Sequence, residues 1–290
     1  MALVLSVLEQ GFIYAILALG VYITYKILDF PDLTVDSSFS LGAAVCVVMI
    51  KAGINPYITL PAAFIAGGLS GLVTGIIHVK FKVRDLLSGI ITMTMLYSVN
   101  LHITGGQANV PIFSNDTIFT LSPVGNTAGE YNTVIVIFVI AVICKISMDL
   151  YLKTKSGYLL RAVGDNETVV TSLAKDKGTV KIVGLVIANA LVALAGCVMC
   201  QQQRFFEISM GTGTIVIGLA SVIIGTNVFG KLSFLKATTA VIIGSVIYKA
   251  CVAIAIACGM QAMDMKLITG ALFLVILIVS SLKKGGADND

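Results

Sequence analysis

Charged residues, tryptophan, proline and histidine are all scarce in this 290-residue sequence. Only 12% of the residues are charged, tryptophan is absent, and there are five prolines and two histidines, whereas 57% of the residues are hydrophobic. In soluble globular proteins about a quarter of the residues are charged. The shortage of charge, together with a mean hydropathy of +0.99, excludes an ordinary soluble domain and predicts an integral membrane protein.

The sequence also lacks the residue combinations that catalysis requires. His78 and His102 are far apart in the predicted topology, and no Ser/His/Asp, Cys/His or metal-ligating cluster accompanies them. No glycine-rich phosphate-binding loop ends in a lysine, so the chain by itself is not expected to bind and hydrolyse ATP. The net charge of +4 gives no indication of nucleic-acid binding. We therefore predict no catalytic residue, no metal ligand and no cofactor in this chain, and a protein that is not an enzyme.

Long apolar runs are what the sequence has in abundance. They are unbroken rather than alternating, which favours transmembrane helices over a β-barrel, and each span needs about 20 residues. The predicted full spans cover residues 3–27, 57–78, 86–103, 133–152, 182–200, 238–258 and 267–282. Two shorter runs, 41–50 and 215–224, bring the total to about eight or nine helices. The predicted fold class is all-α: a polytopic membrane protein with a single transmembrane domain over residues 1–290.

Each short run follows a polar stretch. Residues 29–40, with the helix breaker Pro31, precede the first run, and residues 201–213 precede the second. Irregular backbone at membrane depth is tolerated only where it lines a cavity or is buried in protein, so we interpret both regions as broken helices. An extramembrane loop followed by a short tilted helix is the alternative.

The two broken helices occupy matching places in the two halves of the chain. This match predicts an internal repeat with halves 1–152 and 182–290. In the first half, Asp36, Ser37 and Ser38 are predicted to cap the half-helix that follows them. In the span 57–78, Gly67 and Gly71 have the small-xxx-small spacing that allows two helices to approach closely.

The charged segment 153–181 separates the two halves and has the pattern of an amphipathic helix over residues 165–178. Asp165 or Asn166 is placed to cap it, and Gly178 is placed to end it. The charges at its ends suit the helix dipole, and its apolar stripe predicts a docking surface for a partner. A solvated helical connector is the alternative.

Lysine and arginine cluster in two connections, after 57–78 and after 133–152, whereas residues 104–132 contain neither. The positive-inside rule places both basic connections in the cytoplasm and the loop 104–132 outside. The N-terminus is then predicted outside and the C-terminus in the cytoplasm.

These features favour a transporter that is powered by a separate protein. The rival is a secondary transporter driven by an ion gradient, which ordinarily carries ionisable residues within its spans. The predicted spans are nearly free of ionisable residues; the exceptions are Asp32 and Asp36 in the polar stretch and Glu9 near an end of the first span.

Three stretches carry a resemblance to a known family: FPDLTVDSSFSLGAAV at 30–45, LLSGIITMTMLYSVNLHITGGQANVPIF at 86–113, and LLRAVGDNETVVTSLAKDKG at 159–178. They resemble the permease subunits of bacterial ABC importers, and most closely the tryptophan/tyrosine permease group within the branched-chain amino acid permease family. The resemblance implies a multi-pass protein of the bacterial plasma (inner) membrane that imports a small solute. It points to an aromatic or branched-chain amino acid.

The resemblance also implies partners. These are a second copy of the chain in a homodimer, a cytoplasmic ABC ATPase dimer that uses ATP and Mg, and an extracellular or periplasmic substrate-binding protein. The segment 165–178 matches the family's coupling helix, although the Glu-Ala-Ala-x3-Gly signature of other ABC permeases is not literal here, because Thr168 follows Glu167.

Two sets of site residues follow. Residues expected to contact the ATPase are Asp165, Asn166, Glu167, Val170, Leu173 and Lys175. Residues expected to line a substrate path at the two-fold axis are Asp32, Thr34, Asp36, Ser37, Ser38, Asn100 and Asn109. Capping of its own half-helix is an alternative role for Asp36.

Overall fold

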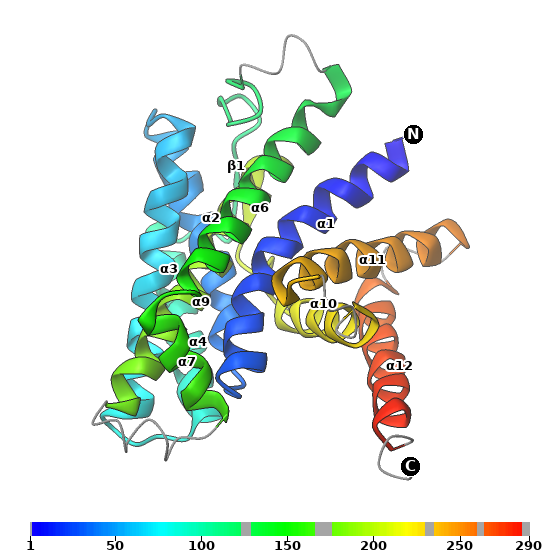
Figure 1. The fold of residues 1–290 in the computed structure, drawn as a ribbon. Helices are drawn as coiled ribbons and strands as arrows, with labels where there is room; N and C mark the ends of the chain where they lie inside the picture. Colours follow the sequence, from blue (N-terminus) through cyan, green and yellow to red (C-terminus); the bar gives the residue numbers. More distant parts are fainter. Residues whose placement is uncertain (1, 123–128, 166–175, 230–234, 260–263, 286–290) are drawn as a thin grey trace.

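The computed structural model describes residues 2–122, 129–165, 176–229, 235–259 and 264–285 and is built almost entirely of helices (Figure 1). The α-helices are α1 (Ala2–Val21), α2 (Thr34–Lys51), α3 (Pro56–Val79), α4 (Asp85–Ile103), α6 (Asn132–Tyr151), α7 (Lys155–Asp165), α9 (Lys177–Gln203), α10 (Thr214–Phe229), α11 (Ala237–Ala257) and α12 (Met265–Gly285). The short elements are a π-helix η1 (Tyr22–Ile27), a 3₁₀-helix η2 (Gly129–Tyr131) and the strands β1 (Asn109–Pro111) and β2 (Phe205–Glu207).

Among the described residues, seven helical segments are long and apolar enough to cross a membrane, and two shorter apolar helices, Thr214–Phe229 and Leu267–Ile278, accompany them. The predicted all-α membrane fold is thus confirmed. The start of α1 and the end of α12 lie at opposite ends of the molecule (Figure 1).

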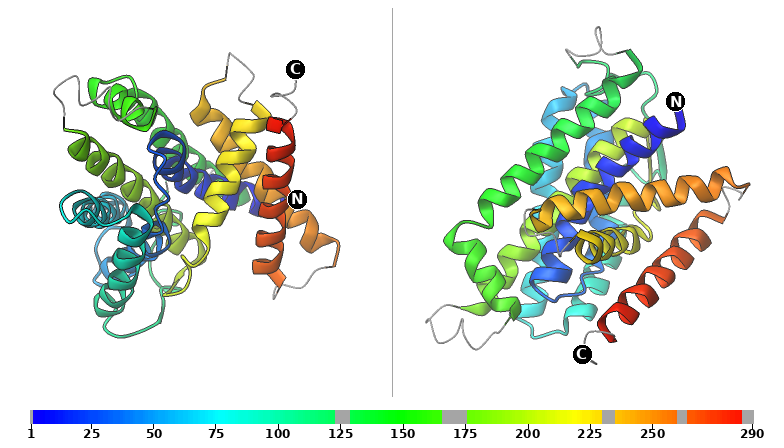
Figure 2. Two further views of the ribbon diagram at one scale, coloured as in Figure 1. Left: turned by 90° about the horizontal axis from the view of Figure 1, so that it is seen from below. Right: turned by 45° about the vertical axis from the view of Figure 1, so that its right-hand side comes forward.

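The helices form two groups, each completed by a helix from the other half of the chain. Helices α2, α3 and α4 gather with α9, whereas α10, α11 and α12 gather with α1 (Figures 1 and 2). Helix α9 packs mainly on α3 and α2, and α1 packs on α11, α9 and α10. This exchange of first helices is the arrangement expected of an internal repeat.

Glycines allow α3 and α9 to approach closely. A Cβ atom on Gly71 would clash with the carbonyl oxygen of Leu185, and one on Gly67 would clash with the carbonyl oxygen of Asn189. Gly68, on the same helix, has room, because its Cβ would lie 3.5 Å from a methyl group of Val186. The close contact predicted for Gly67 and Gly71 is confirmed, and α9 is the helix that makes it.

The first broken helix differs from the prediction. Helix α2 is continuous from Thr34 to Lys51, so the polar residues expected to precede a half-helix lie in its first two turns. Before α2 the chain is irregular only at residues 28–33, where the Asp32 carboxylate accepts a hydrogen bond of 2.9 Å from the backbone N–H of Thr34, the first residue of α2. The predicted capping of residues 41–50 is therefore wrong. The polar side chains are tolerated inside a helix because they find buried partners on other elements.

The second interruption, residues 204–213, lies between α9 and α10. Arg204 ends α9 in a left-handed conformation with φ of 61°. The next residues form β2, which pairs antiparallel with β1 so that Val110 faces Phe206. The sequence did not reveal this pair of strands, because each has only three residues and neither alternates clearly.

The segment between the two halves also needs correction at both ends. Asp165 is helical, as the last described residue of α7, so it is not the non-helical cap that was predicted there, and the other predicted cap, Asn166, lies outside the described residues. Asp176 caps α9 by accepting hydrogen bonds from the backbone N–H groups of Gly178 and Thr179. The prediction that Gly178 ends the coupling helix is therefore wrong. Residues 166–175, which contain the predicted contact residues Asn166, Glu167, Val170, Leu173 and Lys175, lie outside the described residues.

Two substitutions on α3 test the glycine contact with α9. Gly71→Ala should destabilise the protein by about 1–3 kcal/mol, because the added methyl group forces two backbones apart. Gly68→Ala is the matched control and should leave the thermal unfolding midpoint unchanged or slightly raised, since alanine is the better helix former. The measurement is thermal unfolding in detergent, and equal midpoints for the two variants would contradict the packing described here.

Candidate functional site

A chain of buried polar groups joins α2, α3 and α9, with Asn189 of α9 at its centre. The Asn189 amide nitrogen donates to the Asp32 carboxylate at 2.7 Å, and its amide oxygen accepts from the Ser38 hydroxyl at 2.8 Å. Ser38 also lies 2.7 Å from the hydroxyl of Ser70 on α3. All four side chains are buried. Because an unsatisfied polar group is costly in hydrocarbon, this network holds the three helices in one arrangement.

A second buried pair extends the network, since the hydroxyls of Thr34 and Thr74 lie 2.8 Å apart. Of the residues predicted to line a substrate path, Asp32, Thr34 and Ser38 are therefore buried between helices of a single chain, with 1%, 0% and 0% exposure. Their hydrogen-bonding groups have partners within the chain. For these residues, a role in a substrate path remains a prediction that requires α2 to separate from α3 and α9.

Asp36 holds the start of α10. Its carboxylate accepts hydrogen bonds from the backbone N–H groups of Gly213 and Ile215, at 2.8 and 2.9 Å, and from the Thr214 hydroxyl at 3.1 Å. A carboxylate at the N-terminus of a helix satisfies free N–H groups and interacts favourably with the helix dipole. Asp36 thus caps a helix, as the alternative proposed, but the helix belongs to the other half of the chain.

The remaining predicted path residues, Ser37, Asn100 and Asn109, lie on three different elements, α2, α4 and β1. Ser37 faces α4, where its hydroxyl donates to the Met93 carbonyl at 3.0 Å, and Asn100 of α4 donates to the Ser37 carbonyl at 3.3 Å. The amide oxygen of Asn100 is buried without a hydrogen-bond partner among the described residues. Asn109 is exposed on β1, paired with Glu207, and makes no side-chain contact with the others in the described part of the chain.

Helix α7, which leads into the predicted docking segment, is packed firmly on the body of the protein. Leu160 and Val163 of α7 are buried, and a Cβ atom on Gly164 would clash with the carbonyl oxygen of Ile27 in η1. Gly184 of α9 faces both Leu160 and Leu28. The docking segment is therefore flanked by two elements, α7 and α9, that contact each other.

Two basic cavities lie near these flanking elements. One, of about 370 Å³, is lined by residues of α7 and of the ends of α6 and α11, including Lys153, Arg161 and Lys236. The other, of about 580 Å³, lies between the α3–α4 connection and the start of α9 and includes Lys82 and Lys181. Both contain the lysines and arginines that the positive-inside rule places in the cytoplasm.

Asp176, in the wall of the second cavity, is held as a carboxylate. The hydroxyl of Thr179 and the backbone N–H groups of Gly178 and Thr179 hold the pKa of Asp176 below its ordinary value. The start of α9 therefore keeps its cap at neutral pH.

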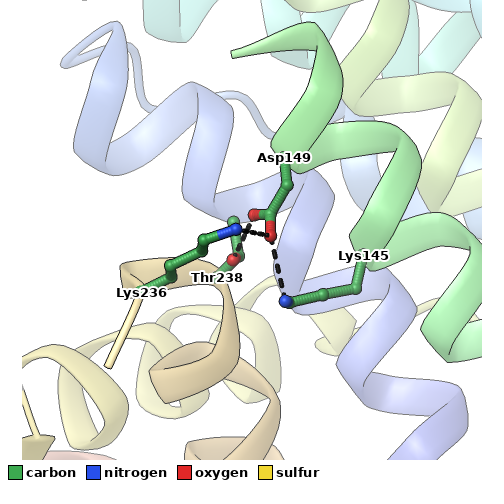
Figure 3. Close-up of polar contacts among 4 residues, drawn as sticks. All are labelled: Lys145, Asp149, Lys236 and Thr238. Atoms are coloured by element: carbon green, nitrogen blue, oxygen red, sulfur yellow. Dashed lines mark hydrogen bonds and ion pairs between the residues drawn. The ribbon is translucent and has the colours of Figure 1, made fainter. Parts of the chain in front are cut away.

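An ion-pair cluster ties α6 to the start of α11 (Figure 3). The Asp149 carboxylate lies 2.9 Å from the Lys145 ammonium on the same helix and 3.0 Å from that of Lys236, and it accepts a 2.6 Å hydrogen bond from the Thr238 hydroxyl. The Asp149 side chain is only 11% exposed, so solvent screens this cluster less than an ordinary surface pair.

The sequence interpretation overlooked four charged residues within predicted spans: Lys26, near the end of the first, and Lys145, Asp149 and Lys249. Lys145 and Asp149 neutralise each other. Lys249, in the middle part of α11, is 6% exposed and has no ion-pair partner among the described residues. A lysine inside a 21-residue apolar run was itself the signal that could have identified this residue.

The buried network predicts a large effect for Asn189. Asn189→Ala leaves Asp32 and Ser38 without their shared partner, and an unsatisfied buried polar group costs about 1–3 kcal/mol. Thermal unfolding of the purified protein should show a clear drop in the midpoint. Asn115→Ala, in a loop, is the control and should behave like the unchanged protein. An unchanged midpoint for Asn189→Ala would show that the network does not hold α2 to α9.

Comparison with known proteins agrees with this architecture. Residues 3–280 match the family model described as branched-chain amino acid transport system / permease component. The chain is 45% identical, over 96% of its length and 92% of the relative, to a tyrosine transport system permease protein of Clostridioides difficile (strain R20291). It is 25% identical, over 76% of its length and 68% of the relative, to a ribose import permease protein of Escherichia coli (strain K12).

A solved inward-facing structure of an ABC transporter, described as of the metal-chelate type, has a similar fold. The TM-score is 0.56 at 14% identity, with 96% of this chain and 84% of that chain covered. At this identity the likeness concerns the fold alone. The chain belongs to the family of permease components of branched-chain amino acid transport systems, and it has the fold of an ABC-transporter permease.

Proposed function

We propose that this chain is the membrane-spanning subunit of a bacterial importer that moves an amino acid, aromatic or branched-chain, into the cytoplasm. The observation that carries the proposal is the 45% identity with a tyrosine transport permease over 96% of the chain. The match of the amino acid transport family over residues 3–280 supports the same class of substrate. The sequence has no phosphate-binding motif, which supports the proposal that a partner hydrolyses ATP, with Mg, for this chain.

The proposed assembly contains two copies of the chain, a cytoplasmic ATPase dimer and a substrate-binding protein outside the membrane. We place the substrate path at the two-fold axis of the homodimer. Helix α4 offers a face for the second copy, because Leu87, Ile91 and Met95 are exposed while Asn100 is buried against α2. An apolar face of this kind is covered either by lipid or by the second copy.

The ATPase is proposed to dock on the segment between α7 and α9. The anchored helix α7 precedes this segment and α9 follows it, and each of these helices contributes residues to one of the two basic cavities. The positive-inside rule places this end of the protein in the cytoplasm, with the N-terminus of the chain outside and its C-terminus inside. A movement of the docking segment would reach α9 and η1 directly, since α7 packs on both.

A secondary transporter is the competing class. The argument against it was that the spans contain few ionisable residues, and the buried Lys249 weakens that argument. One buried lysine without a carboxylate partner is nevertheless a poor site for a coupling sodium ion, because the ammonium repels a metal cation. The family match favours transport powered by a separate ATPase.

The apolar stripe predicted for the docking segment leads to a test of coupling. Val170→Asp or Leu173→Asp should uncouple ATP hydrolysis from uptake, because a charge replaces an apolar contact with the ATPase. Ser172→Asp, on another face of the predicted helix, is the matched control and should retain uptake. The measurements are ATP hydrolysis and uptake by the assembled transporter. Full coupling in both apolar-face variants would contradict this assignment.

The energy source separates the two functional classes. The purified chain in liposomes, given a proton or sodium gradient and labelled tyrosine or leucine, should show no uptake. Uptake should begin when the cognate ATPase, ATP and a loaded binding protein are added. Gradient-driven uptake by the chain alone would identify a secondary transporter instead.

A further inference from the structure

Lys249 carries a charge that the rest of the described chain does not balance. Its ammonium lies 3.9 Å from the centre of the Tyr14 ring and donates a hydrogen bond of 3.3 Å to the side-chain oxygen of Gln10. Both partners come from α1, and both are neutral. Buried charges in membrane proteins are ordinarily paired, and intramembrane lysines mark substrate or ion pathways. The surroundings of Lys249 therefore lack one negative charge.

Two acidic side chains on α1 and α2 are already engaged elsewhere. Glu9 accepts a hydrogen bond of 3.0 Å from Gln202 at the end of α9. Asp36 is held by the three donors at the start of α10. Neither of these carboxylates forms an ion pair with Lys249.

A cavity of about 310 Å³ lies beside Lys249, between α1, α10, α11 and α12. Its polar wall is formed by Tyr14, Thr212, Tyr248, Lys249 and Thr269, and the rest of the wall is mostly apolar. The Tyr248 hydroxyl is buried and makes no hydrogen bond of ordinary geometry with a described residue, although it is close enough to Thr269 for a weak interaction. The cavity thus presents an ammonium and a hydroxyl that both have donor capacity left.

Two glycines, one in α4 and one in α12, differ in the space around them. Gly89 of α4, in the sequence Leu-Ser-Gly, packs on the backbone of Leu33 just before α2. Gly270 of α12, in the related sequence Ile-Thr-Gly, has nothing within 4 Å. Gly270 therefore leaves open space on the α12 side of the cavity.

We propose that this cavity binds the carboxylate of an amino acid during transport, with Lys249 as its charge partner. A carboxylate would supply the missing negative charge and accept hydrogen bonds from the Lys249 ammonium and the Tyr248 hydroxyl. The volume is at the small end of the range of roughly 300–1,000 Å³ for small-molecule pockets, and the apolar wall suits the side chain of an aromatic or branched amino acid. The inference rests on the proposed function, because it assumes that an amino acid passes through this protein.

The test measures equilibrium binding of labelled L-tyrosine to the full-length permease, assembled with its ATPase in nanodiscs. Lys249→Met keeps most of the side-chain volume but removes the charge, so the affinity should fall about tenfold or more. Lys249→Arg should retain most of the binding. Lys51→Met, at the exposed end of α2, is the matched control and should bind like the unchanged protein.

A competition experiment on the unchanged protein tests the proposal even if Lys249→Met fails to fold. It compares ligands that have the carboxylate with ligands that lack it. Tyrosine amide should compete weakly with L-tyrosine in the unchanged protein, whereas equal competition by the amide and the acid would overturn the proposal. Displacement by oleate but not by L-leucine would identify the occupant as a fatty acid and also overturn it. Absence of tyrosine binding would overturn it as well.

ATP-dependent uptake by the same preparation separates this inference from the proposed function. Uptake that is normal in the unchanged protein and unaffected by Lys249→Met would reject the site while leaving the importer assignment intact. Loss of uptake in Lys249→Met, together with normal uptake in Lys51→Met, is the expected result. If the unchanged protein takes up no amino acid with all partners present, the proposed function fails.

Discussion

The contact between α3 and α9 is the constraint on which the rest of the structure depends. Gly67 and Gly71 bring the two backbones close, and Asn189, on the facing surface of α9, uses this approach to bond Asp32 and Ser38. In a lipid environment the polar groups have no water to bond, so they must find one another. Close packing and hydrogen bonding therefore reinforce each other at one place, and together they fix the position of α2.

From that position α2 organises the second half of the chain. Asp36 holds the start of α10, and Ser40 bonds the loop before it through the Ile208 carbonyl and the Gly211 N–H group. Because α1 and α9 each complete the other half's group of helices, neither half has a full set of packing partners by itself. A displacement of α9 at the α7 end therefore acts on both groups.

The polar residues of the permease serve two different purposes. Those of α2 bond side chains of α3 and α9 or the backbone of neighbouring elements, which explains how a polar stretch can lie within a membrane span. Lys249 has only neutral partners among the described residues and borders open space, so its charge is available to a ligand. Whether a buried polar group already has its hydrogen-bond or charge partners, rather than its polarity as such, distinguishes a structural group from a candidate binding group.

The sequence by itself determined the membrane class, most of the helices, the glycine contact and the family, because long apolar runs, small-residue spacing and basic clusters are local patterns. Only the tertiary structure decided what the polar residues do. Asp36 was assigned to its own helix and caps α10 instead, since its partners lie more than a hundred residues away in the sequence. The uninterrupted helix α2 likewise depends on Ser70, Thr74 and Asn189, whose proximity no local pattern can reveal.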